Sequence, residues 1–209
     1  MIARRAFLIC GFAVGLSGAA EATEEAGPER SWRIAASVYG YFVPDQPDFV
    51  MAIVPVDVGR LHFDGRYNYE GVRSGSAFVG GKAGWGRALA LHLTPMIGGV
   101  LGDVDGLVPA LRLTLAWWKV DLYDESEVVV DLHDAGASFF YLWSELGFSP
   151  LGWLRFGAVA QRSRVFHTPL DVQRGMFASV TIRFLTVTLY EFNAGWTTPT
   201  WVGAVSASF

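Results

Sequence analysis

The sequence predicts an all-β fold, a closed antiparallel up-and-down β-barrel of about twelve strands. Three observations support this: apolar and polar residues alternate with a period of two, tight turns alternate with longer loops, and no segment keeps a helical period. The stretch GRLHFDGRYNYEG, residues 59–71, shows the alternation well. Leu61 and Phe63 fall in an apolar set, and His62, Asp64 and Arg66 fall in a polar set. This pattern is typical of a strand with one apolar and one highly polar face.

The turn signals divide the chain into strands. In order, we expect strands at 33–43, 48–57, 59–70, 75–84, 87–98, 107–117, 119–131, 137–148, 151–166, 172–183, 185–193 and 199–208. The second of these is the weakest because Pro55 cannot donate to a sheet ladder, and without it the count would be ten.

The connections alternate in length along this series. Tight turns are predicted at Val58, Trp85–Gly86, Trp118–Lys119, Ser149–Pro150 and Phe184. The longer loops contain PDQP, VRSG, GGVLGDVDG, HDAGA, HTPLD and AGWTTP, which are rich in turn residues. Short turns at one end and longer loops at the other are typical of bacterial outer-membrane barrels. An even strand count follows if both termini lie at the short-turn end.

A two-residue turn at Trp118–Lys119 fixes the register of one hairpin. It places Arg112 opposite Glu125, Thr114 opposite Tyr123 and Ala116 opposite Asp121. Opposed residues of an antiparallel pair share a face, so these polar groups share one face and the neighbouring leucines and valines share the other. Across the next turn, Glu145 comes within diagonal reach of Arg155.

The N-terminus carries the features of an export signal. Two arginines precede an apolar run and then small residues, so we expect a signal peptide at 1–22 and a flexible leader at 23–31 before a barrel at 32–209. Cleavage after Ala20 or Ala22 fits the small residues there, and either cut removes the single cysteine, Cys10, together with two arginines. The cut after Ala20 leaves 14 basic and 20 acidic residues. The resulting net charge of −6 argues against nucleic acid as a partner.

The apolar face is expected to contact lipid, with the polar face lining a lumen. Besides the export signal, aromatic residues near strand ends suit interfacial girdles: Trp32, Trp85, Trp117, Trp118, Trp153, Trp201 and Tyr69. Because unpaired backbone groups are costly in lipid, the sheet must close, with strand 199–208 pairing with 33–43. Phe209 and Trp32 should then meet near the periplasmic rim.

The closing stretch WVGAVSASF, with its C-terminal Phe209, resembles the assembly signal of bacterial outer-membrane β-barrel proteins. The stretches LHFDGRYNYE, LWSELGFSPLGWLRFGAVAQRSR and VQRG also resemble a family of such barrels with no assigned activity. The resemblance implies a location in the bacterial outer membrane and a contact between Phe209 and the barrel-assembly machinery. It implies no catalytic residue and no cofactor.

The polar faces supply candidate lumen-lining residues. These are Arg60, His62, Asp64, Arg66, Lys82, His92, Arg112, Asp121, Tyr123, Glu125, Glu127, Glu145 and Arg155, with Arg183 as a further member. Opposed acidic and basic ladders would create a transverse field, which favours a narrow porin-like channel for small polar solutes. If Arg60 and Arg66 face the acidic residues of strand 119–131, zwitterionic or anionic solutes are expected. The alternative is a filled structural or surface-binding barrel without transport.

Three other chemistries have candidate residues. An outer-membrane hydrolase would use Ser144 on the lipid face, but no histidine falls at an obvious partnering position. Asp103 and Asp105 could ligate calcium, although Gly and Asp are also ordinary turn residues, and no metal site is predicted. Near the outer end, lipopolysaccharide phosphates could bind the candidate residues Arg162, Arg164 and Arg174.

Overall fold

The computed structural model describes residues 32–43, 47–165 and 171–209. They form thirteen strands and one short 3₁₀ helix, η1 (Ala135–Ala137). The strands are β1 (Trp32–Phe42), β2 (Phe49–Val58), β3 (Leu61–Tyr67), β4 (Gly75–Gly81), β5 (Ala83–Trp85), β6 (Leu89–Leu101), β7 (Gly106–Trp117), β8 (Val120–Asp131), β9 (Phe139–Leu151), β10 (Leu154–Val165), β11 (Asp171–Ile182), β12 (Leu185–Phe192) and β13 (Thr200–Ser208). The predicted signal peptide and leader, residues 1–31, lie outside the described residues.

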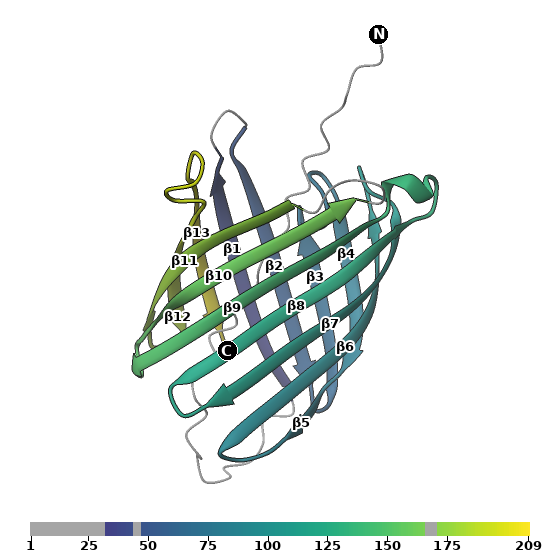
Figure 1. Cartoon of the computed structure of the whole chain (residues 1–209). Coiled ribbons are helices and arrows are strands. Elements are labelled where there is room, and N and C mark those ends of the chain that lie inside the picture. Colours follow the sequence, from purple (N-terminus) through teal and green to yellow (C-terminus); the bar gives the residue numbers. More distant parts are fainter. Residues whose placement is uncertain (1–31, 44–46, 166–170) are drawn as a thin grey trace.

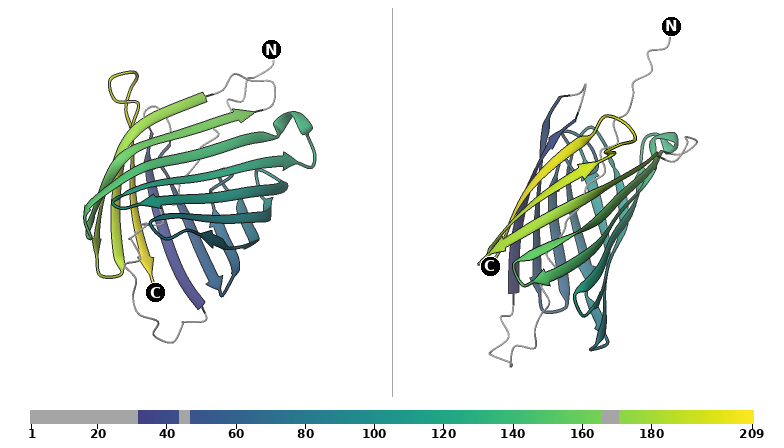
Figure 2. Two further views of the ribbon diagram at one scale, coloured as in Figure 1. Left: turned by 60° about the horizontal axis from the view of Figure 1, so that its bottom comes forward. Right: turned by 60° about the vertical axis from the view of Figure 1, so that its left-hand side comes forward.

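Each strand pairs antiparallel with its neighbours, and the sheet closes on itself (Figures 1 and 2). β4 and the three-residue β5 pair with successive parts of β6. They therefore count as one interrupted strand, and the barrel has twelve strands. The predicted closed up-and-down barrel of twelve strands is therefore confirmed. No helix in the described ranges is both long and apolar enough to cross a membrane.

The first and last strands join as predicted. β1 pairs with β13 from Ala35 opposite Ser208 to Phe42 opposite Trp201. Beyond that ladder, Phe209 donates a backbone hydrogen bond of 2.9 Å to Ile34 and accepts one of 3.4 Å from it. The backbone of the C-terminal residue is therefore hydrogen-bonded to β1. This agrees with the high free-energy cost of unpaired backbone groups in lipid.

β2 is a true strand, which excludes the ten-strand alternative. It pairs with β1 on one side and with β3 on the other. The ladder to β1 is interrupted between Ile34 opposite Val56 and Ser37 opposite Ile53, the stretch that contains Pro55. Proline lacks a backbone donor, so its position explains the local gap without removing the strand.

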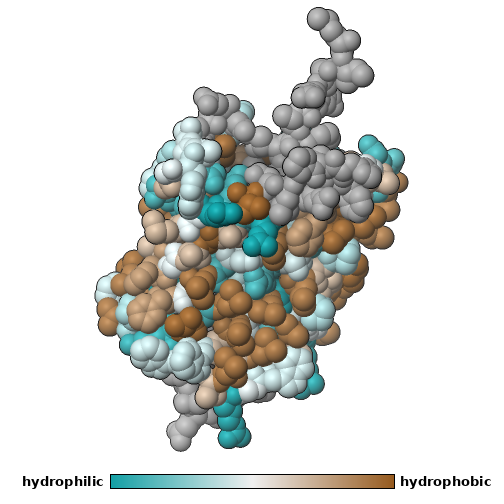
Figure 3. All heavy atoms as spheres, viewed as in Figure 1, coloured by the Kyte–Doolittle hydropathy of each residue, from teal (hydrophilic) through white to brown (hydrophobic). Residues whose placement is uncertain are grey.

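The register of the β7–β8 hairpin is also confirmed: Arg112 lies opposite Glu125, and Thr114 opposite Tyr123. Arg112 and Glu125 are buried, whereas Leu107, Leu111 and other apolar side chains of these strands point outward. Figure 3 shows hydrophobic side chains covering much of the visible outer wall. The barrel is inverted relative to a soluble one, which is the arrangement of a bacterial outer-membrane β-barrel.

Six of the seven predicted girdle residues are at the surface. The tryptophans are 39–72% exposed, from Trp201 at the low end to Trp118 at the high end. Tyr69 is the exception, with only 1% exposure. The girdle prediction was wrong for Tyr69 because β3 ends at Tyr67 and Tyr69 lies in the loop before β4, which begins with a positive φ at Asn68.

Candidate functional site in the lumen

β3 carries three charged or titratable side chains into the barrel. His62, Asp64 and Arg66 alternate with exposed Leu61 and Phe63, and all three are at most 5% exposed. The alternation follows from the two-residue period of a strand whose apolar face meets lipid. The polar face of β3 is therefore the starting point of the lumen site.

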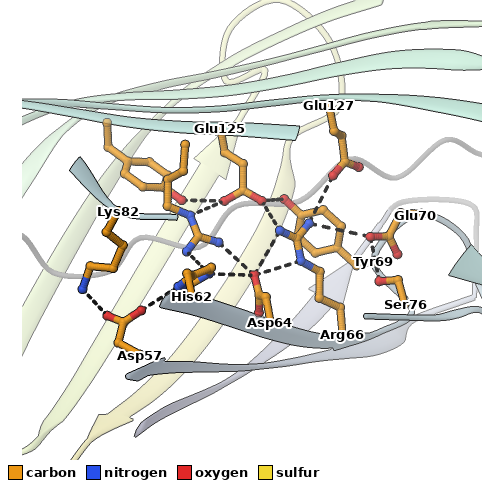
Figure 4. Close-up of polar contacts among 12 residues, drawn as sticks. Asp57, His62, Asp64, Arg66, Tyr69, Glu70, Ser76, Lys82, Glu125 and Glu127 are labelled. Atoms are coloured by element: carbon orange, nitrogen blue, oxygen red, sulfur yellow. Dashed lines mark hydrogen bonds and ion pairs between the residues drawn. The ribbon is translucent and has the colours of Figure 1, made fainter. Parts of the chain in front are cut away.

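The loop after β3 folds inward and adds two residues that were not among the predicted lumen-lining residues. Asn68 has a positive φ of 57°, and its side chain donates to the Val50 carbonyl and accepts from the Arg73 N–H, both at 2.7 Å. This turn buries Tyr69 and Glu70, which the pattern assigned to opposite faces of one strand. Both side chains join the ionic cluster (Figure 4).

Arg66 lies at the centre of this cluster. Its Nη1 is 3.1 Å from Glu127 Oε2 and 3.6 Å from Glu70 Oε1, while its Nη2 is 2.8 Å from Glu125 Oε1 and 3.0 Å from Asp64 Oδ2. The contacts link β3 to β8, which are not neighbours in the sheet. Arg66 therefore joins two separate parts of the wall through the lumen.

Two aromatic rings complete the surroundings of Arg66. The guanidinium carbon is 4.2 Å from the ring centroid of Tyr69 and 4.2 Å from that of Phe78. Such distances allow a favourable interaction between the cation and each ring. We call the four carboxylates Asp64, Glu70, Glu125 and Glu127, with these two rings, the Arg66 cage.

Glu125 connects the cage to the β7–β8 hairpin. It accepts hydrogen bonds from Tyr69 at 2.9 Å, Tyr123 at 2.6 Å and Arg112 Nε at 3.0 Å. Arg112 also donates from Nη2 to Asp64 at 3.0 Å. Buried charges are stable only when they are paired in this way.

An arm of the network reaches toward the short-turn end. Arg112 Nη1 lies 3.3 Å from His62 Nε2. His62 Nδ1 lies 2.7 Å from Asp57 Oδ1, so the imidazole connects Arg112 to Asp57. Asp57 also pairs with the half-buried Lys82.

A second cluster is formed by side chains of β8, β9 and β10. Arg155 binds Asp121 and donates to Glu145 from Nη1 at 2.5 Å. Glu145 also accepts from Trp143 at 3.2 Å and from Tyr190 at 3.0 Å. The predicted proximity of Glu145 and Arg155 is confirmed, and the contact with Tyr190 links β9 to β12.

Aromatic side chains pack beside this cluster. The ring of Trp143 lies 5.4 Å from that of Tyr190 and 5.5 Å from that of Phe192, both edge-on. Tyr39 and Tyr141 are each 1% exposed. The sequence does not show which side of the barrel wall a tyrosine faces, because its ring suits a lipid interface and its hydroxyl suits a polar lumen.

Most of the predicted lumen-lining residues come together here. Ten are buried in the barrel: His62, Asp64, Arg66, Arg112, Asp121, Tyr123, Glu125, Glu127, Glu145 and Arg155. Lys82 is half-buried, and His92 lies on the inward register of β6, opposite Thr114, but is exposed near the strand end. The predictions for Arg60 and Arg183 were wrong: both are exposed residues of tight turns, and Arg183 has a φ of 58°.

The other candidate chemistries receive ordinary explanations. Ser144 faces outward and donates a hydrogen bond to Asp124. Asp103 pairs with Arg73 and raises the pKa of that exposed guanidinium, while Asp105 accepts from the Gly102 N–H at 3.0 Å. Within the described ranges, no group of three or more potential metal ligands is assembled.

The predicted lipopolysaccharide residues are only partly described. Arg162 and Arg174 are exposed on the outer surface of β10 and β11, and the Arg174 guanidinium lies 6.0 Å from the Trp196 ring. The backbone of Arg164 belongs to β10, but its side chain lies outside the described residues.

The comparisons with known proteins identify similar barrels. No family model matches the sequence, and no curated protein matches it. Among solved structures, the KdgM porin matches with a TM-score of 0.61 at 10% identity, covering 84% of this chain and 99% of that one. The KdgM porin in complex with disordered oligogalacturonate matches with a TM-score of 0.58 at 10% identity, over 85% and 99% of the two chains. At these identities the similarity shows the fold alone.

Proposed function

We propose that this barrel is a narrow outer-membrane channel for small polar solutes, with the ionic cluster around Arg66 and Glu125 as its constriction. The observation that carries the proposal is the meeting of β3, β7 and β8 side chains through the lumen. Charged groups of both signs held in a narrow lumen select solutes by charge and by hydrogen bonding. A barrel of this size leaves little free width, so the constriction controls passage.

The fold supports this proposal without naming a solute. The matched KdgM structure is described as a porin, and this barrel covers nearly all of its length. The lumen also contains paired charges of opposite sign. A barrel that only needed a filled interior could use apolar side chains, which avoid the cost of burying charges.

Reconstitution in a planar lipid bilayer tests the proposal. We expect discrete conductance steps whose size changes in Glu125→Gln and Arg66→Gln, because both residues lie in the constriction. An exposed control, Arg73→Gln, should leave the steps unchanged. Silence of the folded wild-type barrel across salts and voltages would instead identify a filled structural barrel. Esterase activity lost in Ser144→Ala would favour the hydrolase interpretation.

Two contacts with the membrane environment extend the proposal. We expect Arg162 and Arg174 to bind lipopolysaccharide phosphates, since exposed arginines near a membrane surface bind phosphate well. The assembly machinery is expected to recognise the last strand through Phe209, which is 59% exposed.

A further inference from the structure

The Arg66 cage contains more carboxyl groups than guanidinium groups. Four carboxyl groups surround the two guanidinium groups of Arg66 and Arg112. The second cluster likewise has Asp121 and Glu145 around the single guanidinium of Arg155. In the part of the lumen that the structure describes, this ratio favours cationic solutes over anionic ones.

Two carboxylate oxygens in the cage are unused. Asp64 Oδ1 and Glu70 Oε2 have no hydrogen-bond donor among the described residues, although these side chains are only 2% and 3% exposed. Arg66 Nη2 is close to two carboxylates but is not oriented to donate a hydrogen bond to either. A buried acceptor without a donor is unfavourable, so the cage offers bonds that Arg66 does not make.

The shape of the cage also matches a planar cation. Tyr69 and Phe78 each present a ring to the guanidinium at 4.2 Å, and carboxylates approach all of its nitrogens. Carboxylates bind guanidinium by parallel, directed hydrogen bonds, and aromatic faces add attraction for the cation. Here the barrel's own Arg66 occupies the cage.

We propose that the Arg66 cage is a binding site for solutes that carry a guanidinium group, and that Arg66 is a tethered occupant which such solutes displace during passage. This inference rests on the proposed channel function and adds a class of solute to it. It differs from the expectation of anionic or zwitterionic solutes, because Arg60, which was expected to add positive charge, is in an exposed turn, and carboxyl groups outnumber guanidinium groups.

Bilayer recordings on the full chain test the site in two steps. Under a potassium chloride gradient, the reversal potential should show that the wild type prefers cations. In Arg66→Ala, which empties the cage, guanidinium chloride should reduce the potassium current at millimolar concentration. Sodium shares the charge but not the shape, and urea shares the shape but not the charge, so neither should reproduce the effect.

Matched variants identify the cage as the site. Arg155→Ala removes the same charge from the same lumen, but its cluster offers two carboxylates and one ring. Guanidinium should inhibit Arg66→Ala at about tenfold lower concentration than Arg155→Ala, and adding Glu127→Gln to Arg66→Ala should remove most of that difference. If Arg66→Ala does not fold, as judged by heat-modifiable migration in gels, Arg66→Gln replaces it.

The outcomes separate the two proposals. A folded barrel that never conducts overturns the channel function and the solute site together. A channel that conducts but shows no cation preference, or that responds to guanidinium, sodium and urea alike in Arg66→Ala, overturns the solute site alone. Equal inhibition of Arg66→Ala and Arg155→Ala also overturns it.

Discussion

Replacing Arg112 with methionine should destabilise the barrel strongly. Arg112 is 5% exposed and lies 3.0 Å from both Asp64 and Glu125. Methionine has a comparable length but no charge, so the change leaves two buried carboxylates with less compensation. Breaking a buried ion pair from one side costs about 3–5 kcal/mol. At an m-value of about 2 kcal/mol per molar, the urea midpoint should fall by roughly 2 M.

The assay is urea unfolding of the barrel in phospholipid vesicles, followed by tryptophan fluorescence. Arg73→Met is the control, because Arg73 pairs with Asp103 in exposed loops, and it should not shift the midpoint measurably. Adding Glu125→Gln to Arg112→Met should restore part of the lost stability, because one uncompensated charge is removed. Equal midpoints for Arg112→Met and Arg73→Met, or simple additivity in the double variant, would refute the reasoning.

Three further predictions concern the wall and its surroundings. In Gly157→Ala the new Cβ would lie 1.9 Å from a carbonyl oxygen of β9, so the yield of folded barrel should fall sharply. Gly203→Ala, where a Cβ meets open space, should fold normally. Equal yields of folded barrel, measured by gel migration, would contradict this prediction. Arg162→Gln combined with Arg174→Gln should weaken lipopolysaccharide binding measured by calorimetry, and unchanged binding would exclude these residues as the site. Deleting Phe209 should slow membrane assembly in cells, as pulse-chase labelling would show, and normal kinetics would count against its role as a signal.

The sequence predicts the wall of this barrel better than its interior. The β7–β8 pairing was predicted residue by residue, because a two-residue turn and a strict period leave only one register that buries Arg112 and Glu125 on the same face. The prediction failed at Arg60, which belongs to a two-residue turn with Gly59. A shift of one residue at a turn is enough to move a side chain from lumen to solvent.

The contacts across the lumen could not be predicted from strand pairing. Arg66 contacts Glu127 across the lumen because the sheet is curved into a barrel. β3 and β8 are not paired in the sheet, so strand pairing alone does not predict this contact. Tyr69 was missed because the alternating pattern continues through Asn68 and places this tyrosine on the apolar face, whereas the positive φ of Asn68 turns the chain inward. Asparagine is among the residues that tolerate this conformation, and this was the one available signal. Glu70 falls in the polar set of this pattern but was not included among the predicted lumen residues.

A cysteine scan along β7 tests the central claim most directly. The chain has one cysteine, in the predicted signal peptide, so single cysteines can carry a nitroxide label. If lipid covers the apolar face, labels at Leu111, Leu113 and Leu115 should collide readily with oxygen dissolved in the bilayer, and labels at Ala110 and Thr114 should not. This gives a period of two in oxygen accessibility. Greater accessibility of the leucine positions to a water-soluble nickel complex, or no period at all, would contradict the account.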